Sequence, residues 1–180
     1  YSILAGIAFG LCAATFSKLI SFISKKFKNN IQYPPLRPVF GGIIIAIAVF
    51  AIGTTKYIGL GIPTIVESFQ LQEPLYVFAL KMAFTIITLS AGYKGGEVTP
   101  LFYIGATLGS ALSLFLPLPT ALLAGMGFVA VFAGATNTSL VCMMMGIELF
   151  GIESGIYIAI ACVVSFLLSG PNSIYGKQII

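Results

Sequence analysis

Long apolar stretches separated by short turn-forming segments run along the whole chain. The first stretch, residues 2–23, has the length that a helix needs to cross the hydrocarbon core of a bilayer, about 20 residues. A more polar stretch, residues 57–73, predicts a loop that contains a short helix. Further apolar helices are predicted at residues 39–52, 75–91, 100–117, 118–132, 140–150 and 156–168. The pattern therefore indicates an all-α polytopic membrane protein.

The breaks in the second half of the chain are rich in Gly, Pro, Thr and Ser. They fall at residues 92–99, 134–138, 151–154 and 169–173. In hydrocarbon, every backbone N–H and C=O needs a partner within the protein, so a break at membrane depth must be buried in protein or line a wet cavity. Short, interrupted helices are typical of transporters and channels that bind ions at broken helix ends. The pattern favours solute movement over a purely structural role.

Composition strengthens the membrane assignment and excludes several kinds of chemistry. Hydrophobic residues make up 58% of the chain, charged residues only 8%, and the mean hydropathy is +1.06. The chain has no His, and all five acidic residues are Glu. These absences exclude His-based triads, HExxH zinc sites and Asp-held Mg²⁺. We expect no enzyme, no cofactor and no metal site.

Basic residues gather between the first two apolar stretches, and cysteines are scattered. Lys25, Lys26, Lys28 and Arg37 fall in a predicted loop, residues 24–37. The positive-inside rule makes this loop cytoplasmic in a multi-pass protein of the cell membrane, with the lipid bilayer and not nucleic acid as its partner. The three cysteines lie in apolar runs without CxxC spacing, which predicts buried core residues instead of disulfides.

The string G-G-E-V-T-P, residues 95–100, carries the strongest chemical signal. Thr99 followed by Pro100 predicts a helix start, with Thr as N-cap and Pro at the first helical position. Gly95 and Gly96 let the preceding backbone bend and approach a ligand closely. A helix N-terminus that points into a membrane cavity presents free N–H groups and the positive end of a dipole, which together form an anion site.

Glu97 has two interpretations in this setting. An ionised carboxylate would repel an anion, whereas a carboxyl that burial keeps protonated would donate its O–H to one. One residue could then either exclude an anion or bind it together with a proton, as proton-coupled anion exchange requires. Alternatively, Glu97 is only the cap or the dipole partner of this helix, and no ion is involved.

These residues resemble the carboxy-terminal half of the CLC family of anion channels and transporters. In that family a G-G-x-F-x-P motif starts a helix whose amides face the central anion. Pro100 matches the motif's Pro, Val98 takes the place of its Phe, and Tyr175 matches a Tyr that donates its hydroxyl to the same ion. Glu97 and Thr99 resemble the fluoride-transporting branch, where G-G-E-V-T-P is the expected form. The resemblance implies fluoride/proton antiport by a homodimer.

The resemblance also implies an architecture and a missing part. We expect a CLC-like bundle of tilted, partly discontinuous helices that is the second half of an inverted repeat. Residues 1–180 would be a single transmembrane portion that works with the amino-terminal half of the same subunit. The first half's gating motif, of the form G-x-E-G-P, does not occur in these residues. Residues 59–63, Gly-Leu-Gly-Ile-Pro, are either an ordinary connection or similar to a first-half anion loop in which Leu60 replaces a Ser.

Several alternatives stay open. The protein could be a chloride-type CLC channel or chloride/proton exchanger, or a structural subunit of a membrane complex. Tyr175 could be an interface anchor, and Glu148 either a proton-path carboxylate or a structural acid that faces the bundle interior. Glu67 and Glu73 are predicted to be solvated. Two small-xxx-small pairs, Gly6 with Gly10 and Gly105 with Gly109, predict close helix contacts.

Overall fold

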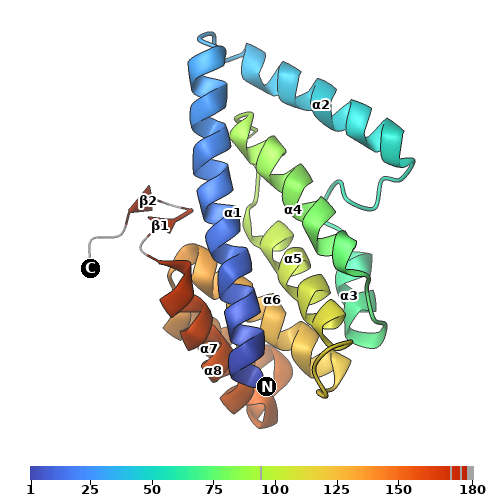
Figure 1. The fold of residues 1–180 in the computed structure, drawn as a ribbon, viewed down its shortest axis with the longest axis vertical. Coiled ribbons are helices and arrows are strands. Elements are labelled where there is room, and N and C mark those ends of the chain that lie inside the picture. The colour runs from blue at the N-terminus through green and yellow to red at the C-terminus, as the bar shows by residue number, and fades with distance from the viewer. Residues whose placement is uncertain (94, 171, 175, 178–180) are drawn as a thin grey trace.

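The computed structural model describes residues 1–93, 95–170, 172–174 and 176–177. The described residues form eight α-helices and one antiparallel pair of two-residue strands, in which Asn172 pairs with Lys177 and Ser173 with Gly176. Figure 1 shows the helices as one bundle, with α2 crossing one end of it. The elements are α1 (Ser2–Asn30), α2 (Leu36–Ile52), α3 (Ile62–Gln70), α4 (Leu75–Ser90), α5 (Val98–Leu112), α6 (Thr120–Thr136), α7 (Ser139–Phe150), α8 (Ile152–Ser169), β1 (Asn172–Ser173) and β2 (Gly176–Lys177).

Helix lengths divide the bundle into spans and shorter pieces. Among the described residues, α1 and α8 are long and apolar enough to cross a membrane. Five further apolar helices have 10–17 residues. Helix α5 has 15 residues and is therefore about 22 Å long, which is less than the ~30 Å of a hydrocarbon core. The all-α membrane architecture with discontinuous helices, as the sequence predicts, is confirmed.

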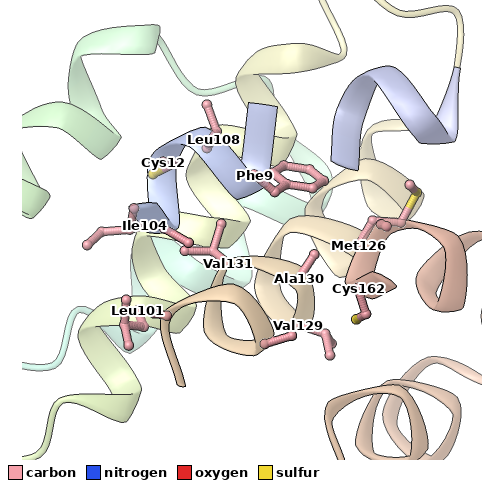
Figure 2. Packing of buried hydrophobic residues seen from close by; sticks show 14 of the residues in the cluster. Phe9, Cys12, Leu101, Ile104, Leu108, Met126, Val129, Ala130, Val131 and Cys162 are labelled. Atoms are coloured by element: carbon pink, nitrogen blue, oxygen red, sulfur yellow. The ribbon is translucent and has the colours of Figure 1, made fainter. Parts of the chain in front are cut away.

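The main core lies where α1, α5, α6 and α8 meet. Figure 2 shows side chains from these four helices lying close together at this junction, among them Phe9, Ile104, Met126 and Cys162. All four are fully buried. Cys12 and Cys142 are also buried, and the three cysteines are free thiols within this cluster, as predicted.

Glycines allow two pairs of helices to touch through their backbones. A Cβ added at Gly109 in α5 would overlap the carbonyl of Leu123 in α6. On the other side of the core, a Cβ at Gly10 in α1 would lie 2.9 Å from the Leu168 Cβ of α8. The close contacts predicted from the two small-xxx-small pairs are confirmed. The tight α5–α6 pair holds the start of α5 in a fixed place.

The prediction of a loop at residues 24–37 is wrong in its extent. Helix α1 continues through Lys25, Lys26 and Lys28 to Asn30, and only residues 31–35 separate it from α2. Lys has a high helix propensity, and cations near a helix C-terminus interact favourably with the dipole, so this cluster extends the helix instead of ending it. Arg37 then ties the two helices together, because its Nε donates a 2.9 Å hydrogen bond to the Ile31 carbonyl.

Three other predicted boundaries shift. Helix α5 ends at Leu112 instead of residue 117, and α6 continues to Thr136 across the predicted break at residue 134. Helix α8 begins at Ile152 instead of residue 156, because Gly151 alone makes the turn with φ 85°. The Ser154 hydroxyl, predicted to lie in that break, is in the first turn of α8 and donates to the Phe150 carbonyl at the end of α7 at 2.8 Å.

Glu73 is buried, so the prediction that it is solvated is wrong, whereas Glu67 is exposed as predicted. The Glu73 carboxylate forms an ion pair with Lys56 at 3.1 Å. The backbone N–H of Glu73 donates a 3.0 Å hydrogen bond to Ser110 Oγ, and that hydroxyl donates to the Leu71 carbonyl at 2.7 Å. These bonds fix the end of α3 and the start of α4 against α5.

Helix α5 begins partway along the bundle. In Figure 1, α4 rises beside α1, and the connection after it returns toward the middle of the molecule before α5 starts. Helix α4 packs against α5 along this path, and Tyr93 in the connection donates its hydroxyl to the Pro38 carbonyl of α2 at 2.9 Å. The G-G-E-V-T-P string is therefore held at mid-depth in the bundle.

Candidate functional site

The first turn of α5 differs by one residue from the sequence prediction. The helix begins at Val98 with Glu97 as N-cap, so Thr99 is the second helical residue and not the cap. Glu97 has φ −84° and ψ −19°, and its side chain makes no capping hydrogen bond. A side-chain cap usually needs an extended backbone at that residue, which this conformation does not provide. The alternative that Glu97 acts as a side-chain cap is wrong, and so is the assignment of Thr99 as the N-cap.

Backbone amides at this helix start lack acceptors. The Leu101 N–H donates to the Glu97 carbonyl at 3.3 Å, and Pro100 has no N–H. Among the described residues, the N–H groups of Val98 and Thr99 have no hydrogen-bond acceptor. Amides at the positive end of a 15-residue helix that lack an acceptor among the described residues can donate to an anion.

Two polar side chains accompany these amides. Glu97 and Thr99 are both half-buried, and among the described residues neither the carboxyl nor the hydroxyl has a hydrogen-bond partner. Glu97 lies in the connection outside the helical spans, where partial burial raises the pKa of its carboxyl above the ordinary value of 4.5. Val98 is 36% exposed. The arrangement offers two N–H groups, one hydroxyl and one carboxyl that can carry a proton.

A cavity of about 220 Å³ lies beside this helix start. Its walls are the loop from Tyr57 to Leu60, residues of α4, the connection with Gly95 and Gly96, and Pro100 in the first turn of α5. A water occupies ~30 Å³ of liquid, so the space accommodates several waters or a hydrated ion. Of the G-G-E-V-T-P motif, Gly95, Gly96 and Pro100 line this cavity, whereas Glu97, Val98 and Thr99 are not among its lining residues.

A buried lysine in the same cavity was missed by sequence reasoning. Lys81 of α4 is 2% exposed and lines the cavity. Its ammonium donates to the carbonyl oxygens of Tyr57 at 3.2 Å and Gly59 at 2.5 Å. The signal that could have found it is plain: an ionisable residue in an apolar, membrane-length helix is a functional candidate by default.

Tyr175, a candidate from the sequence, lies outside the described residues. The neighbour of Tyr175, Ile174, donates its N–H to the Ala135 carbonyl of α6 at 3.0 Å. This bond attaches the segment after α8 to the same helix that packs against α5.

Other candidates lie away from this cavity. Glu148 is exposed on α7, so the interpretation as an acid facing the bundle interior is wrong. A larger cavity of about 410 Å³ lies between α3, α6 and α8. Its lining is mostly apolar, with Phe69, Phe150 and Tyr157 among the residues, and it contains no residue of the G-G-E-V-T-P motif. Within the described part of the chain, no cluster of three metal-ligating side chains occurs.

The fold and the site together define a membrane protein of the channel and transporter type. Its apolar helices include one that starts within the bundle, and the connection before that start lines a cavity. The chain belongs to the CLC family, because the family model described as "Voltage gated chloride channel" matches residues 1–170. The predicted family resemblance is confirmed.

Relatives named for both chloride and fluoride match nearly the whole chain. It is 52% identical over 180 residues to the "Chloride/fluoride channel protein" of Pseudomonas syringae pv. tomato, covering 97% of this chain and 40% of the relative. It is 27% identical over 191 residues to the "Voltage-gated ClC-type chloride channel ClcB" of Escherichia coli O81, covering 96% of this chain and 44% of that protein.

A solved structure has the same fold. The structure described as "Crystal structure of a CLC-type fluoride/proton antiporter" superposes with a TM-score of 0.91 at 33% sequence identity. The match covers 97% of this chain and 44% of the other. The chain thus spans less than half the length of the curated relatives it matches.

Proposed function

We propose that this chain is the carboxy-terminal half of a fluoride/proton antiporter that exports fluoride across the cell membrane. In this proposal it works with the amino-terminal half of the same subunit, in a homodimer, and performs no enzymatic step. The residues that follow α1, from 31 to 35, would face the cytoplasm. The proposal is supported by the similarity to a chloride/fluoride channel protein and to a fluoride/proton antiporter structure.

The observation that carries the proposal is the set of hydrogen-bond donors at the start of α5. Fluoride is small and strongly hydrated, so a site for it must replace its water with compact, strong hydrogen-bond donors. The Val98 and Thr99 amides and the Thr99 hydroxyl are donors of this kind. Glu97 becomes a further donor when its carboxyl is protonated.

Each residue then has a definite role. Fluoride binds the amides of Val98 and Thr99 while a neutral Glu97 donates its O–H. Loss of that proton leaves a carboxylate that repels the anion, which couples the two movements. Gly95 and Gly96 leave room for the ion because neither has a neighbouring atom within 4 Å of an added Cβ. Pro100 fixes the first turn, and Tyr175 supplies a phenol hydroxyl to the same ion.

A chloride-type channel or exchanger is the second candidate. The 27% identity to a chloride channel and the chloride name of the family favour it. A chloride site depends more on its size and on a diffuse positive potential. In such a site, Glu97 and Thr99 would have no role in anion binding. The third candidate, a structural subunit, predicts well-packed continuous spans. The cavity that borders Gly95, Gly96 and Pro100 argues against it.

The test is transport by the full-length gene product that contains these residues, reconstituted in liposomes. A fluoride electrode and a pH electrode record both ions during efflux, and chloride is offered in a parallel series. We expect fluoride efflux to be accompanied by opposite proton movement. Glu97→Gln should abolish the proton movement, whereas the matched control Glu67→Gln, at an exposed residue of α3, should leave it intact.

Each result decides between the candidates. Chloride flux without fluoride preference favours the chloride-type alternative. Proton movement that persists in Glu97→Gln removes the assignment of this residue. No anion flux of either kind, in a protein that is correctly folded by size-exclusion chromatography, favours the structural subunit.

A further inference from the structure

Lys81 is held in the wall of the cavity that borders the start of α5. Its side chain is 2% exposed, and its ammonium lies 4.8 Å from the centroid of the Tyr103 ring. The carbonyl oxygens of Tyr57 and Gly59 accept two hydrogen bonds from it. An ammonium has three N–H groups, so one remains beyond these two bonds.

The positive charge of Lys81 is not balanced by a carboxylate. The ion pair among the described residues joins Lys56 to Glu73, and no acidic side chain in that part of the chain contacts Lys81. Carbonyl oxygens and an aromatic face carry only partial negative charge. They orient the ammonium and lower its desolvation cost, but they do not cancel a full unit charge. In a low-dielectric interior, such a charge acts over long distances and attracts an anion.

The geometry brings this charge close to the start of α5. Lys81 from α4, Gly95 and Gly96 from the connection, and Pro100 from the first turn of α5 line the same cavity of about 220 Å³. An anion inside it therefore has a fixed cation in one wall and the first turn of α5 at another, where the helix dipole is positive. The lining is mostly apolar, so the Lys81 charge is little screened there and favours anions over cations.

We propose that Lys81 is the fixed counter-charge of an anion position in this cavity, which gathers small anions before they reach the amides of Val98 and Thr99. The assignment rests on the proposed transport function and adds a positioning residue to it. The competing role is mechanical. Lys81 could serve only to hold the loop at Tyr57 and Gly59 in shape, through its two hydrogen bonds.

Charge and hydrogen bonding can be separated by three substitutions of Lys81. Lys81→Gln removes the charge and keeps an N–H donor for the loop carbonyls. Lys81→Met removes both, and Lys81→Arg keeps both. Lys28→Met is the matched control, because it deletes one positive charge from an exposed residue at the end of α1. The readouts are the fluoride concentration that gives half-maximal flux in liposomes and the rise in unfolding temperature that fluoride produces in detergent.

We expect Gln and Met to raise the half-maximal fluoride concentration by about tenfold, which corresponds to ~1.4 kcal/mol of anion binding. Arg should stay within about twofold of the wild type, and Lys28→Met should match it. The variants should rank in the same order in the rise of unfolding temperature that fluoride produces, because this rise reports fluoride binding without transport. A Gln variant with wild-type values in both readouts overturns the counter-charge role and leaves the mechanical one.

The outcome also separates this inference from the proposed function. A wild-type protein that moves no fluoride overturns the antiport proposal. If fluoride or chloride still stabilises that protein, and Lys81→Gln removes the stabilisation, the proposed anion position is supported although the antiport proposal is not. If the wild type transports fluoride and none of the Lys81 variants changes either readout, the antiport proposal stands and the role of Lys81 falls.

Discussion

Gly105 in α5 and Gly127 in α6 bring two helix backbones into direct contact: a Cβ added to either residue would overlap the carbonyl of the other. The pair lies in the contact between α5 and α6, and Leu101 and Ile104 of α5 belong to the main core. Because the proposed anion site lies at the first turn of α5, its depth in the bundle depends on this contact.

Gly105→Ala should therefore destabilise the protein by about 2 kcal/mol, within the range for overpacking a tight interior. Backbone atoms of α6 cannot move aside as a flexible side chain could. The measurement is thermal unfolding in detergent, followed by circular dichroism. Gly96→Ala is the comparison, because no atom lies within 4 Å of a Cβ added there. Equal unfolding temperatures for the two variants would contradict the backbone contact.

Ser110→Ala tests the bonds that attach the α3–α4 connection to α5. The Ser110 hydroxyl accepts from the Glu73 N–H at 3.0 Å and donates to the Leu71 carbonyl at 2.7 Å, so its loss leaves two main-chain groups unsatisfied. We expect a loss of about 2 kcal/mol in the free energy of unfolding. Ser21→Ala, at an exposed residue of α1, is the control and should change stability by less than ~0.5 kcal/mol. Hydrogen exchange at Glu73 and neighbouring amides should accelerate only in the Ser110 variant.

The proposed role of Glu97 predicts how fluoride binding depends on pH. Burial raises the pKa of this carboxyl above its ordinary value of 4.5, and the neutral form is the one that donates to fluoride. Fluoride affinity should therefore rise as pH falls from neutral toward that raised pKa. Above the pKa, each pH unit lowers the neutral fraction about tenfold. Glu97→Gln is neutral throughout, so its fluoride affinity should be independent of pH.

Isothermal titration with fluoride at a series of pH values measures this dependence. Glu67→Gln supplies the control with a pH profile like that of the wild type. A Glu97→Gln variant that keeps the wild-type pH dependence would show that another group carries the proton.

Tyr175→Phe addresses the residue that lies outside the described part of the chain. If its hydroxyl donates to the anion, its removal should weaken fluoride binding by about 10- to 100-fold, the cost of one hydrogen bond to a charged partner. The half-maximal fluoride concentration for flux is the measurement, and unfolding temperature checks the fold. Tyr157→Phe, at a residue 42% exposed on α8, is the matched control. Equal fluoride affinity in both variants would favour the alternative that Tyr175 is an interface anchor.

Apolar periodicity predicted the bundle well, because burial and bilayer length restrict helices strongly. The helix start after residue 74, a short helix within residues 57–73 and the glycine contacts follow from local sequence, whereas α5 begins at Val98, two residues before the predicted start. Helix ends were less predictable. Gly134 and the lysines at the end of α1 look like breaks, but packing on α8 and the helix dipole keep both segments helical.

The sequence predicted the motif of the candidate site but not the residues that surround it. The residues Gly95 to Pro100 are contiguous, so their chemistry could be read directly. Lys81 and the Tyr57–Gly59 loop lie far from them in sequence and meet only in the fold. Glu73 is similar: its burial depends on the ion pair with Lys56, and no local pattern encodes that contact.

Helix α1 has 29 residues and is therefore about 43 Å long, which exceeds a hydrocarbon core of ~30 Å by roughly two turns. Lys25, Lys26 and Lys28 occupy those last turns, and lysines at such a level extend to lipid phosphates. In the proposed transporter, these lysines would anchor the end of α1 to one plane of headgroups. The packing of α1, α5 and α6 would then fix the depth of the α5 start below that plane.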